Sequence, residues 1–386
     1  MNFNTIGIIC EYNPFHFGHK YHIEQTKKLC GGENVVCVMS GSMVQRGECA
    51  ILDKWQRARL AVDSGADLVI ELPAYYVLQS ADIFAQGAIK ILNKLNIIDA
   101  LSFGSECGNT DILYKAANIM DSDEYNNSIK KFLDTGISYP KASQLALKHC
   151  MPNIDDEFLK PNNTLGICYI KAIKKLNSSI TPLSVKRDND YHSEKSNDGF
   201  MSATQIRKMI ENNENYNKYS PDYSLDCTYN IKNAESYILG TLRNTDINKF
   251  RTIKGYEEGL GELILNSAKK ACTIEELFDM CVSKRYTLHR IKRYVMAVLL
   301  DVWYDSEPEY IRILAMSEKG GKLINNIKEK SDIDIITKLA DYKKENLMLK
   351  TDIAATDFAS LCANNIDMRY SGKDYTTSPY IKKPSL

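Results

Sequence analysis

The sequence predicts an α/β fold, in which a parallel sheet built from the first half of the chain is followed by a mainly α-helical domain. Short apolar runs alternate with longer amphipathic stretches up to about residue 185, which is the pattern of βαβ units. Residues 216–226 are rich in Asn, Tyr, Ser and Pro, and helical periodicity dominates from about 233 to 360. The length of 386 residues is enough for two domains. We therefore expect domains at 1–220 and 221–386, with an exposed tail at the end.

Five short apolar runs are the predicted strands of the sheet. They are Thr5–Cys10, Val35–Ser40, Asp67–Leu72, Ala100–Phe103 and Thr181–Val185. Parallel sheets bind ligands beyond the carboxyl ends of their strands, so the polar residues that follow these runs are the first candidates for a site. The loop after Cys10 comes first among them.

The overall composition excludes several classes of protein. The 49 basic and 49 acidic residues balance, so a surface that binds nucleic acid must be local. The eleven cysteines form no CxxC pair, and several lie in apolar runs, which is typical of reduced thiols in the cytosol. No basic segment precedes the first apolar run, and no stretch is long enough to span a bilayer. We therefore expect a cytoplasmic protein with no membrane partner, and the sequence indicates no particular oligomeric state.

The strongest motif is His16-Phe17-Gly18-His19, which follows the first predicted strand at the expected start of a helix. A helix N-terminus offers unpaired N–H groups and a positive dipole, glycine lets the backbone approach closely, and imidazoles can donate to phosphoryl oxygens. The motif therefore predicts a nucleotide phosphate site, with His16 and His19 as catalytic residues. Two other interpretations stay open, namely capping or core histidines and a metal site formed with His22.

Further polar residues follow the later strands. Gly104 comes directly after the fourth predicted strand, Arg187 follows the fifth, and Arg46 lies in a loop after the second. Two more groups stand at expected helix starts, and they are Asn162 with Asn163, and Ser202, Thr204 and Arg207. The asparagines either cap a helix or contact a base edge, and the second group is either a second anion site or a plain N-cap with a surface arginine.

One segment of the second half is strongly basic. Residues 284–294 hold two tyrosines and no acid. The basic residues are Lys284, Arg285, Arg290, Lys292 and Arg293. Cations can contact phosphates while tyrosine rings stack on bases, which predicts a surface for RNA. A solvated helix face is the alternative.

Motifs along nearly the whole chain resemble those of one known family, the bacterial tRNA(Met) cytidine acetate ligases. The segments are GIICEYNPFHFGHKYHI, VMSGSMVQRGECAILDKWQRARLAVDSGADLVIELP, FGSE, PNNTLGICYIKAI, SVKR, SATQIR, KRYTLHRIKRY and DIAATDFASL. The resemblance implies a Rossmann-like nucleotidyltransferase domain of the HxGH type, followed by a helical tRNA-binding domain. It also implies a ligase that activates acetate with ATP, releases pyrophosphate and acetylates N4 of the wobble cytidine in elongator tRNA(Met), with N4-acetylcytidine as product.

The resemblance further implies an ATP site. Its loop comprises Gly7, Ile8, Ile9, Cys10, Glu11, Tyr12, Asn13, Pro14, Phe15, His16, Phe17, Gly18, His19 and Lys20. Gly104, one of Asn162 and Asn163, and Arg187 complete it, with Ser202, Thr204 and Arg207 as a second phosphate contact. The chain has Ser202-Ala203-Thr204 where common nucleotidyltransferases carry Ser-Ser or Ser-Thr before the arginine, and Cys49 where we expect proline in relatives.

The expected mechanism needs no covalent nucleophile. Acetate attacks the α-phosphorus in line, His16 and His19 stabilise the phosphoryl oxygens, and Lys20 helps to hold pyrophosphate. Magnesium is expected because the triphosphate carries several negative charges, although the sequence shows no carboxylate cage and predicts no metal site of its own. The alternatives are a small-molecule adenylyltransferase, such as one making a cofactor or coenzyme A precursor, and a non-catalytic RNA-binding module with a vestigial pocket.

Overall fold

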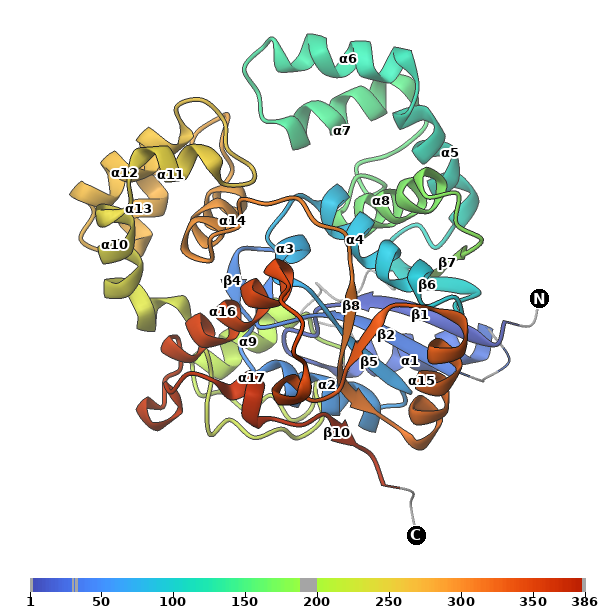
Figure 1. Cartoon of the computed structure of the whole chain (residues 1–386). Coiled ribbons are helices and arrows are strands. Elements are labelled where there is room, and N and C mark those ends of the chain that lie inside the picture. Colours follow the sequence, from blue (N-terminus) through green and yellow to red (C-terminus); the bar gives the residue numbers. More distant parts are fainter. Residues whose placement is uncertain (1–2, 30, 32–33, 188–199, 384–386) are drawn as a thin grey trace.

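The computed structural model describes residues 3–29, 31, 34–187 and 200–383, and its centre is a largely parallel sheet (Figure 1). The five predicted strands are confirmed with nearly the predicted bounds. They are β1 (Thr5–Cys10), β2 (Asn34–Ser40), β5 (Leu68–Leu72), β6 (Ala100–Ser105) and β7 (Thr181–Lys186). The strand order is β10-β8-β5-β2-β1-β6-β7, with β9 paired to β8. A short antiparallel pair, β3 (Met43–Val44) with β4 (Glu48–Cys49), stands outside this sheet.

The central strands are buried on both faces because helices cover each side. Successive side chains of a strand point to opposite faces. Ile8 and Cys37 accordingly pack with residues of α1 and α2, whereas Ile9 and Val38 pack with residues of α4. The helices of this part are α1 (Phe17–Leu29), α2 (Lys54–Asp63), α3 (Ala74–Val77), α4 (Ala81–Lys94), α5 (Thr110–Met120), α6 (Asp123–Leu133), α7 (Tyr139–Cys150), α8 (Pro161–Lys175) and α9 (Ala203–Glu211).

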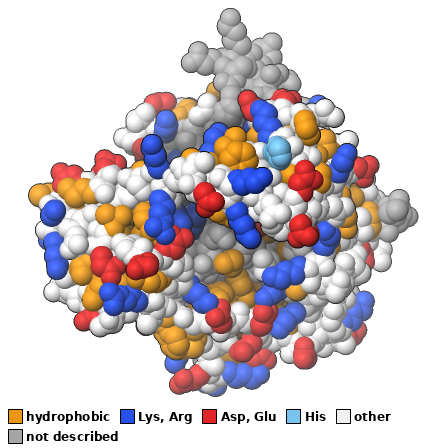
Figure 2. Space-filling model, turned by 90° about the horizontal axis from the view of Figure 1, so that it is seen from above, with side chains coloured by type: hydrophobic (Ala, Val, Ile, Leu, Met, Phe, Trp, Pro, Cys, Tyr) orange, Lys and Arg blue, Asp and Glu red, His pale blue; other side chains and the backbone are white. Residues whose placement is uncertain are grey.

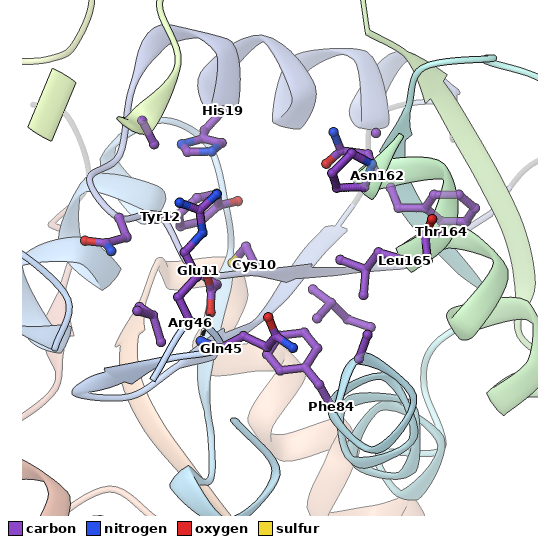
Figure 3. A pocket seen from close by; sticks show the side chains of 18 of the residues that line it. Cys10, Glu11, Tyr12, His19, Gln45, Arg46, Phe84, Asn162, Thr164 and Leu165 are labelled. Carbon is purple, nitrogen blue, oxygen red and sulfur yellow. Dashed lines mark hydrogen bonds between the residues drawn. The ribbon is translucent and has the colours of Figure 1, made fainter. Parts of the chain in front are cut away.

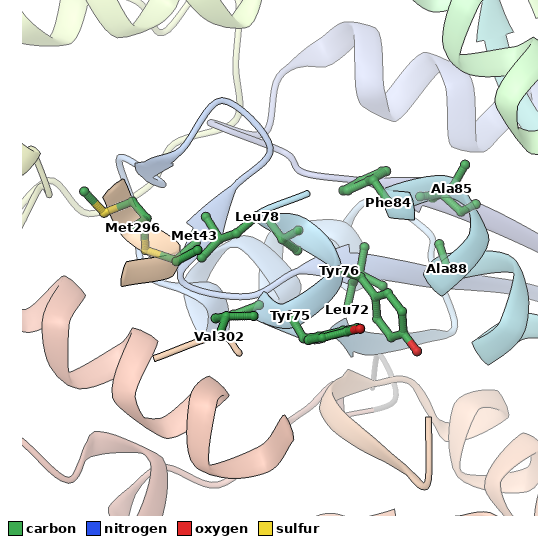
Figure 4. Packing of buried hydrophobic residues seen from close by; sticks show 14 of the residues in the cluster. Met43, Leu72, Tyr75, Tyr76, Leu78, Phe84, Ala85, Ala88, Met296 and Val302 are labelled. Atoms are coloured by element: carbon green, nitrogen blue, oxygen red, sulfur yellow. The ribbon is translucent and has the colours of Figure 1, made fainter. Parts of the chain in front are cut away.

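A lobe of helices follows and stands apart from the sheet in Figure 1. It contains η2 (Ile231–Ala234), α10 (Glu235–Asn244), α11 (Ile247–Thr252), α12 (Leu260–Lys270), α13 (Ile274–Cys281) and α14 (Leu288–Leu299). Figure 4 shows its joint with the sheet, where Met296 of α14 lies beside Met43 and Val302 lies near Tyr75. Apolar packing therefore fixes the end of α14 against the β3–α3 region.

The last part of the chain returns to the sheet, which the helical periodicity does not predict. It forms β8 (Tyr310–Met316), α15 (Glu318–Lys330), β9 (Asp334–Ile336), η3 (Leu339–Asp341), α16 (Leu347–Leu361), η4 (Ile366–Met368), α17 (Lys373–Thr376) and β10 (Tyr380–Ile381). β8 pairs antiparallel with β5 and parallel with β10. The mainly helical character beyond residue 233 is confirmed, but 380–381 belong to the sheet rather than to an exposed tail, and Pro384 lies outside the described residues. The division at 220 stays a prediction.

A buried ion-pair cluster joins this returning part to the first half of the chain. Lys54 Nζ lies 2.7 Å from Glu71 Oε1 and 2.8 Å from Asp374 Oδ1. Arg312 Nη1 lies 2.6 Å from the same Asp374 oxygen. All four side chains are almost fully buried. Charge neutralisation within the cluster explains how β8 can carry an arginine inside an apolar run, and why that run does not stand out as a buried strand.

No helix among the described residues is long and apolar enough to cross a membrane.

Arg312→Ala should strongly destabilise the fold. It leaves Glu71 and Asp374 with one cation between them in a buried site, and removing one partner from such a site typically costs about 3–5 kcal/mol. Urea denaturation measures the free energy of unfolding. Lys322→Ala, which removes an exposed i,i+4 pair on α15, is the control and should cost under about 1 kcal/mol. Equal losses in the two variants would contradict the structural role of the cluster.

Candidate active site

A cavity of about 580 Å³ lies at the carboxyl ends of β1, β6 and β7, beside the β3–β4 hairpin (Figure 3). Of the predicted residues, those that line it are Ile8, Ile9, Cys10, Glu11, Tyr12, Asn13, His19, Gly104, Asn162, Arg187, Thr204 and Arg207. Figure 3 shows His19, Tyr12 and Arg46 on one side, and Asn162, Thr164 and Leu165 on the other. Residues from the ends of three parallel strands therefore meet in one place, as the position of a site in a parallel sheet predicts.

The turn between β1 and α1 is tightly fixed. It contains the cis peptide Asn13–Pro14 and Tyr12 with a φ of 48°. His16 is buried and its ring stacks on that of His19 with the centroids 3.6 Å apart. The His16 N–H donates to His19 Nδ1 at 3.3 Å, so a neutral His19 carries its proton on Nε2. The ring that lines the cavity can therefore donate a hydrogen bond into it.

Burial keeps these imidazoles neutral. Burial, and secondarily the charge of Arg187, lowers the pKa of His16 to about 3 and that of His22 to about 4. Burial also holds the pKa of His19 well below its usual range, with smaller effects from His16 and Arg187. His16 Nδ1 is buried without a hydrogen-bond partner among the described residues, whereas His22 Nε2 contacts Ser102 Oγ at 3.1 Å. Neutral hydrogen-bond donors suit phosphoryl oxygens.

The metal interpretation finds no support in this part of the chain. His22 is already engaged with Ser102, which also contacts Thr26 Oγ1 at 2.7 Å. Among the described residues, no group of three His, Cys, Asp or Glu is arranged to hold a metal ion.

Several predicted residues lie beside the cavity rather than on its wall. They are Gly7, Pro14, Phe15, His16, Phe17, Gly18, Lys20, Asn163 and Ser202. A Cβ at Gly7 would lie 2.8 Å from Leu92 Cδ1, so this glycine allows α4 to pack against β1. Lys20 is exposed on the first turn of α1. Ser202 forms a capping box with Gln205 at the start of α9, as in the plain N-cap interpretation.

The two asparagines of α8 have different surroundings. Asn163 is fully buried, and its side chain accepts from Cys107 N at 3.2 Å and donates to Phe158 O at 3.1 Å. Asn162 lines the cavity, and its amide donates to Glu106 Oε1 at 2.7 Å. Neither asparagine is the N-cap of α8, which is Lys160 without a side-chain bond. The Glu106 carboxylate instead accepts the N–H groups of Asn162 and Asn163, a role that the sequence analysis missed.

Arg57 is a second residue that the sequence analysis missed. Its guanidinium is buried in α2 and donates to the carbonyl oxygens of Glu11, Ser40, Gly41 and Leu52. Burial lowers its pKa to about 10, against the opposing charges of nearby carboxylates. Because Glu11 follows β1 and Ser40 ends β2, one side chain fixes both strand ends at the cavity. An arginine in a helical stretch gives no sequence signal for such a role.

The comparisons with known proteins cover the whole molecule. Residues 3–374 match the family model of the HIGH Nucleotidyl Transferases. The tRNA(Met) cytidine acetate ligase of Acetivibrio thermocellus is 38% identical over 98% of this chain and 99% of its own length, and that of Clostridium botulinum strain Okra is 40% identical over 99% and 100%. The chain belongs to the tRNA(Met) cytidine acetate ligase family. The crystal structure of Thermotoga maritima TmcAL bound with alpha-thio ATP is similar over 99% of both chains, with a TM-score of 0.87 and 28% identity.

In the basic segment 284–294, only some of the basic side chains are exposed and unpaired among the described residues. α14 begins at Leu288, so Lys284 and Arg285 precede it in an exposed loop. Arg285 and Arg290 both pair with Glu257, at 3.3 and 2.5 Å. Tyr286 and Tyr294 are buried, so the prediction that these rings stack on bases is wrong. Their apolar surface goes into the core of the helical lobe instead.

The other two predicted RNA contacts hold α14 against the β3–β4 hairpin. Lys292 pairs with Glu48, and Arg293 Nη1 donates to Gln45 O at 3.2 Å. Burial, followed by the charge of Arg290, lowers the pKa of Arg293 to about 10. A Cβ at Gly47, where φ is 77°, would collide with the Arg293 backbone. This close approach places α14 against the hairpin whose residues Gln45 and Arg46 line the cavity.

The neutral histidines should make stability depend on pH. The unfolded chain binds protons at these imidazoles below pH 6.5, while folded His16 stays neutral to about pH 3. The contribution of neutral His16 to the free energy of unfolding is therefore complete above pH 6.5. It is lost as the pH falls toward 3, by at most about 1.4 kcal/mol per pH unit. We expect His16→Asn to flatten this slope in denaturant titrations. His149→Asn, at an exposed site on α7, is the control, and an unchanged slope in His16→Asn would refute the assignment.

Proposed function

We propose that this protein is an ATP-dependent ligase that forms N4-acetylcytidine at the wobble position of elongator tRNA(Met), through an acetyl-adenylate intermediate. The observation that carries the proposal is the cavity at the HxGH turn, in which a neutral His19 donor and Asn162 lie on opposite walls, while α14 of the helical lobe bonds to Gln45 of the same wall as His19. The full-length relatives named tRNA(Met) cytidine acetate ligase support the same activity.

ATP would bind along the carboxyl ends of β1, β6 and β7. His19, on the first turn of α1, meets the phosphates, while Gly104, Asn162 and Arg187 contact the nucleoside. A Cβ at Gly104 would lie 3.1 Å from Arg187 Cδ, so glycine keeps the arginine close to this strand end. Thr204 and Arg207 provide a further anion contact, and the Arg207 guanidinium is held by Asn13 O and by Thr204 Oγ1.

In the first step, a carboxylate oxygen of acetate attacks the α-phosphorus and pyrophosphate leaves. The residues present supply position and hydrogen bonds rather than a covalent nucleophile. His16 would act through its stacking on His19 and through its unpartnered Nδ1. Exposed Lys20 can meet pyrophosphate only as it departs. Magnesium would arrive on the triphosphate, because the described residues offer no carboxylate cluster for it.

In the second step, the cytidine N4 amine attacks the acetyl carbonyl and AMP leaves. An anticodon base is unpaired and can enter a cavity of this size. Lys284 and Arg285 are the basic residues best placed for tRNA, because they are exposed and lie outside the contact between α14 and the β3–β4 hairpin. Such a reaction takes place in the cytoplasm, where tRNA is found. A small-molecule adenylyltransferase would leave the helical lobe without a role.

Incubation with labelled acetate, ATP, magnesium and tRNA(Met), followed by nucleoside analysis, should yield N4-acetylcytidine at the wobble position. His19→Ala should reduce pyrophosphate release at least about 100-fold, since single donors to a developing charge contribute on that scale. His149→Ala on α7 is the matched control. ATP binding without acetyl transfer in the wild-type protein would favour the adenylyltransferase instead.

Lys284→Glu combined with Arg285→Glu should weaken tRNA binding about tenfold or more. It should also lower the salt dependence of binding by roughly two phosphate contacts. The control carries Lys322→Glu and Lys328→Glu on α15, on the far side of the sheet in Figure 1. Pyrophosphate release without tRNA, measured in parallel, separates a binding defect from damage to the cavity. Wild-type tRNA affinity in the first variant would exclude this loop as a contact.

A further inference from the structure

Glu11 is the one acidic side chain among the described residues that line the cavity. It follows β1 directly and stands between the HxGH turn and the β3–β4 hairpin. Its Oε1 accepts the Gln45 N–H at 2.6 Å, and its Oε2 accepts no hydrogen bond from any described residue. Figure 3 shows Glu11 beside Arg46 and close to Gln45 and Cys10. One carboxylate oxygen is thus fixed and the other is open to a reactant.

The position of Glu11 is where a tRNA base would enter. The phosphate-binding turn and the Gly104–Arg187 side take up the β1–β6–β7 part of the cavity. The opposite side carries Glu11, at the end of β1, and Gln45 and Arg46 of the β3–β4 hairpin. It touches the helical lobe through the bond from Arg293 to Gln45 O. Figure 2 views the molecule from above and shows several Lys and Arg side chains, with some Asp and Glu side chains among them, around a hollow in this face.

The second step requires a proton acceptor. When an amine attacks a mixed anhydride, the nitrogen becomes positively charged and must lose a proton, whereas the AMP phosphate leaves without protonation. Most of the titratable groups on the cavity wall cannot accept that proton. Arginines are always charged, and burial raises the pKa values of Cys10, Tyr12 and Tyr169 well above their ordinary ones, so these groups are protonated.

The two lining histidines are also unsuitable. His19 Nδ1 already accepts the His16 N–H, and its Nε2 carries the proton in the neutral ring. His22 Nε2 contacts Ser102 Oγ, and burial lowers the pKa of His22 to about 4, so this ring is a weak proton acceptor. A carboxylate with a free oxygen is what remains.

We propose that Glu11 is the general base of the acyl-transfer step, an inference that rests on the ligase function proposed above. The N4–C bond forms as the bond between the acetyl carbon and the phosphate oxygen breaks. AMP leaves with that electron pair, and the N4 proton passes to Glu11 Oε2 and then to water. Glu11 is then a catalytic residue for the second step, in addition to bordering the ATP loop.

Burial and the neighbouring charges set the pKa of Glu11. Burial raises its pKa, while the Gln45 N–H and then Arg57, Arg46 and Arg207 lower it. These arginines come from α2, the β3–β4 hairpin and α9, and Tyr169 faces it from α8. The net shift is upward, so Glu11 binds a proton more strongly than an exposed glutamate and is the better base.

The test uses chemically prepared acetyl adenylate and an in vitro tRNA(Met) transcript under single-turnover conditions, which bypasses the first step. In Glu11→Gln, acetyl transfer near pH 7.5 should fall by about 10²- to 10⁴-fold. The wild-type rate should fall as the pH drops through the Glu11 pKa, and we call this fall the acid limb of the pH–rate profile. Glu11→Gln should lack the acid limb. Arg46→Gln should move the limb to higher pH, because Arg46 lowers that pKa.

Two further variants keep the test decisive. Glu11→Asp should transfer more slowly yet keep an acid limb, and Glu329→Gln, an exposed acid on α15, should keep the limb of the wild type. Transfer by Glu11→Gln within about threefold of the wild-type rate, with the acid limb retained, would overturn the proposal. A wild-type protein that transfers nothing from acetyl adenylate would instead refute the proposed function itself.

Discussion

The geometry of the cavity depends first on the buried guanidinium of Arg57. Backbone carbonyl groups just beyond the carboxyl end of a strand no longer accept a hydrogen bond from the neighbouring strand. Burying such a carbonyl without another donor costs free energy. Arg57 bonds to such carbonyls after both β1 and β2. The HxGH turn and the β3–β4 hairpin therefore start from backbone positions fixed by one side chain. Arg57 therefore fixes the backbone at Glu11, from which the HxGH turn and the contact with Gln45 follow.

The helical lobe is tied into the same arrangement. α14 meets the β3–β4 hairpin through the Lys292–Glu48 pair, the Arg293–Gln45 bond and the apolar contact of Met296 with Met43. The Gln45 N–H donates to the Glu11 carboxylate, and the Gln45 carbonyl oxygen accepts from the Arg293 guanidinium. One residue thus connects the reactive carboxylate to the lobe that we propose carries the tRNA.

The sequence predicted the parts of this molecule that depend on local signals. Five strands and the HxGH helix start were predicted because apolar period and flanking polarity are local properties. β8 was not, because the charge of Arg312 is neutralised by Glu71 and Asp374, which are distant in sequence. Likewise, the pattern could not distinguish Asn162 from Asn163, or exposed Lys284 from Arg293, which is bonded to the hairpin. Those distinctions depend on which side chains the tertiary fold buries.

The connectivity of the sheet has a consequence for synthesis on the ribosome. The chain leaves the sheet after β7, builds the whole helical lobe, and returns only at β8 to pair with β5. A nascent chain that has emerged as far as the lobe holds β5 with an open edge, and Lys54 with Glu71 but without Arg312 and Asp374. Long-range pairings of this kind form late. A product that ends early therefore exposes an unpaired strand edge, which favours association with other chains, and an incomplete charge cluster.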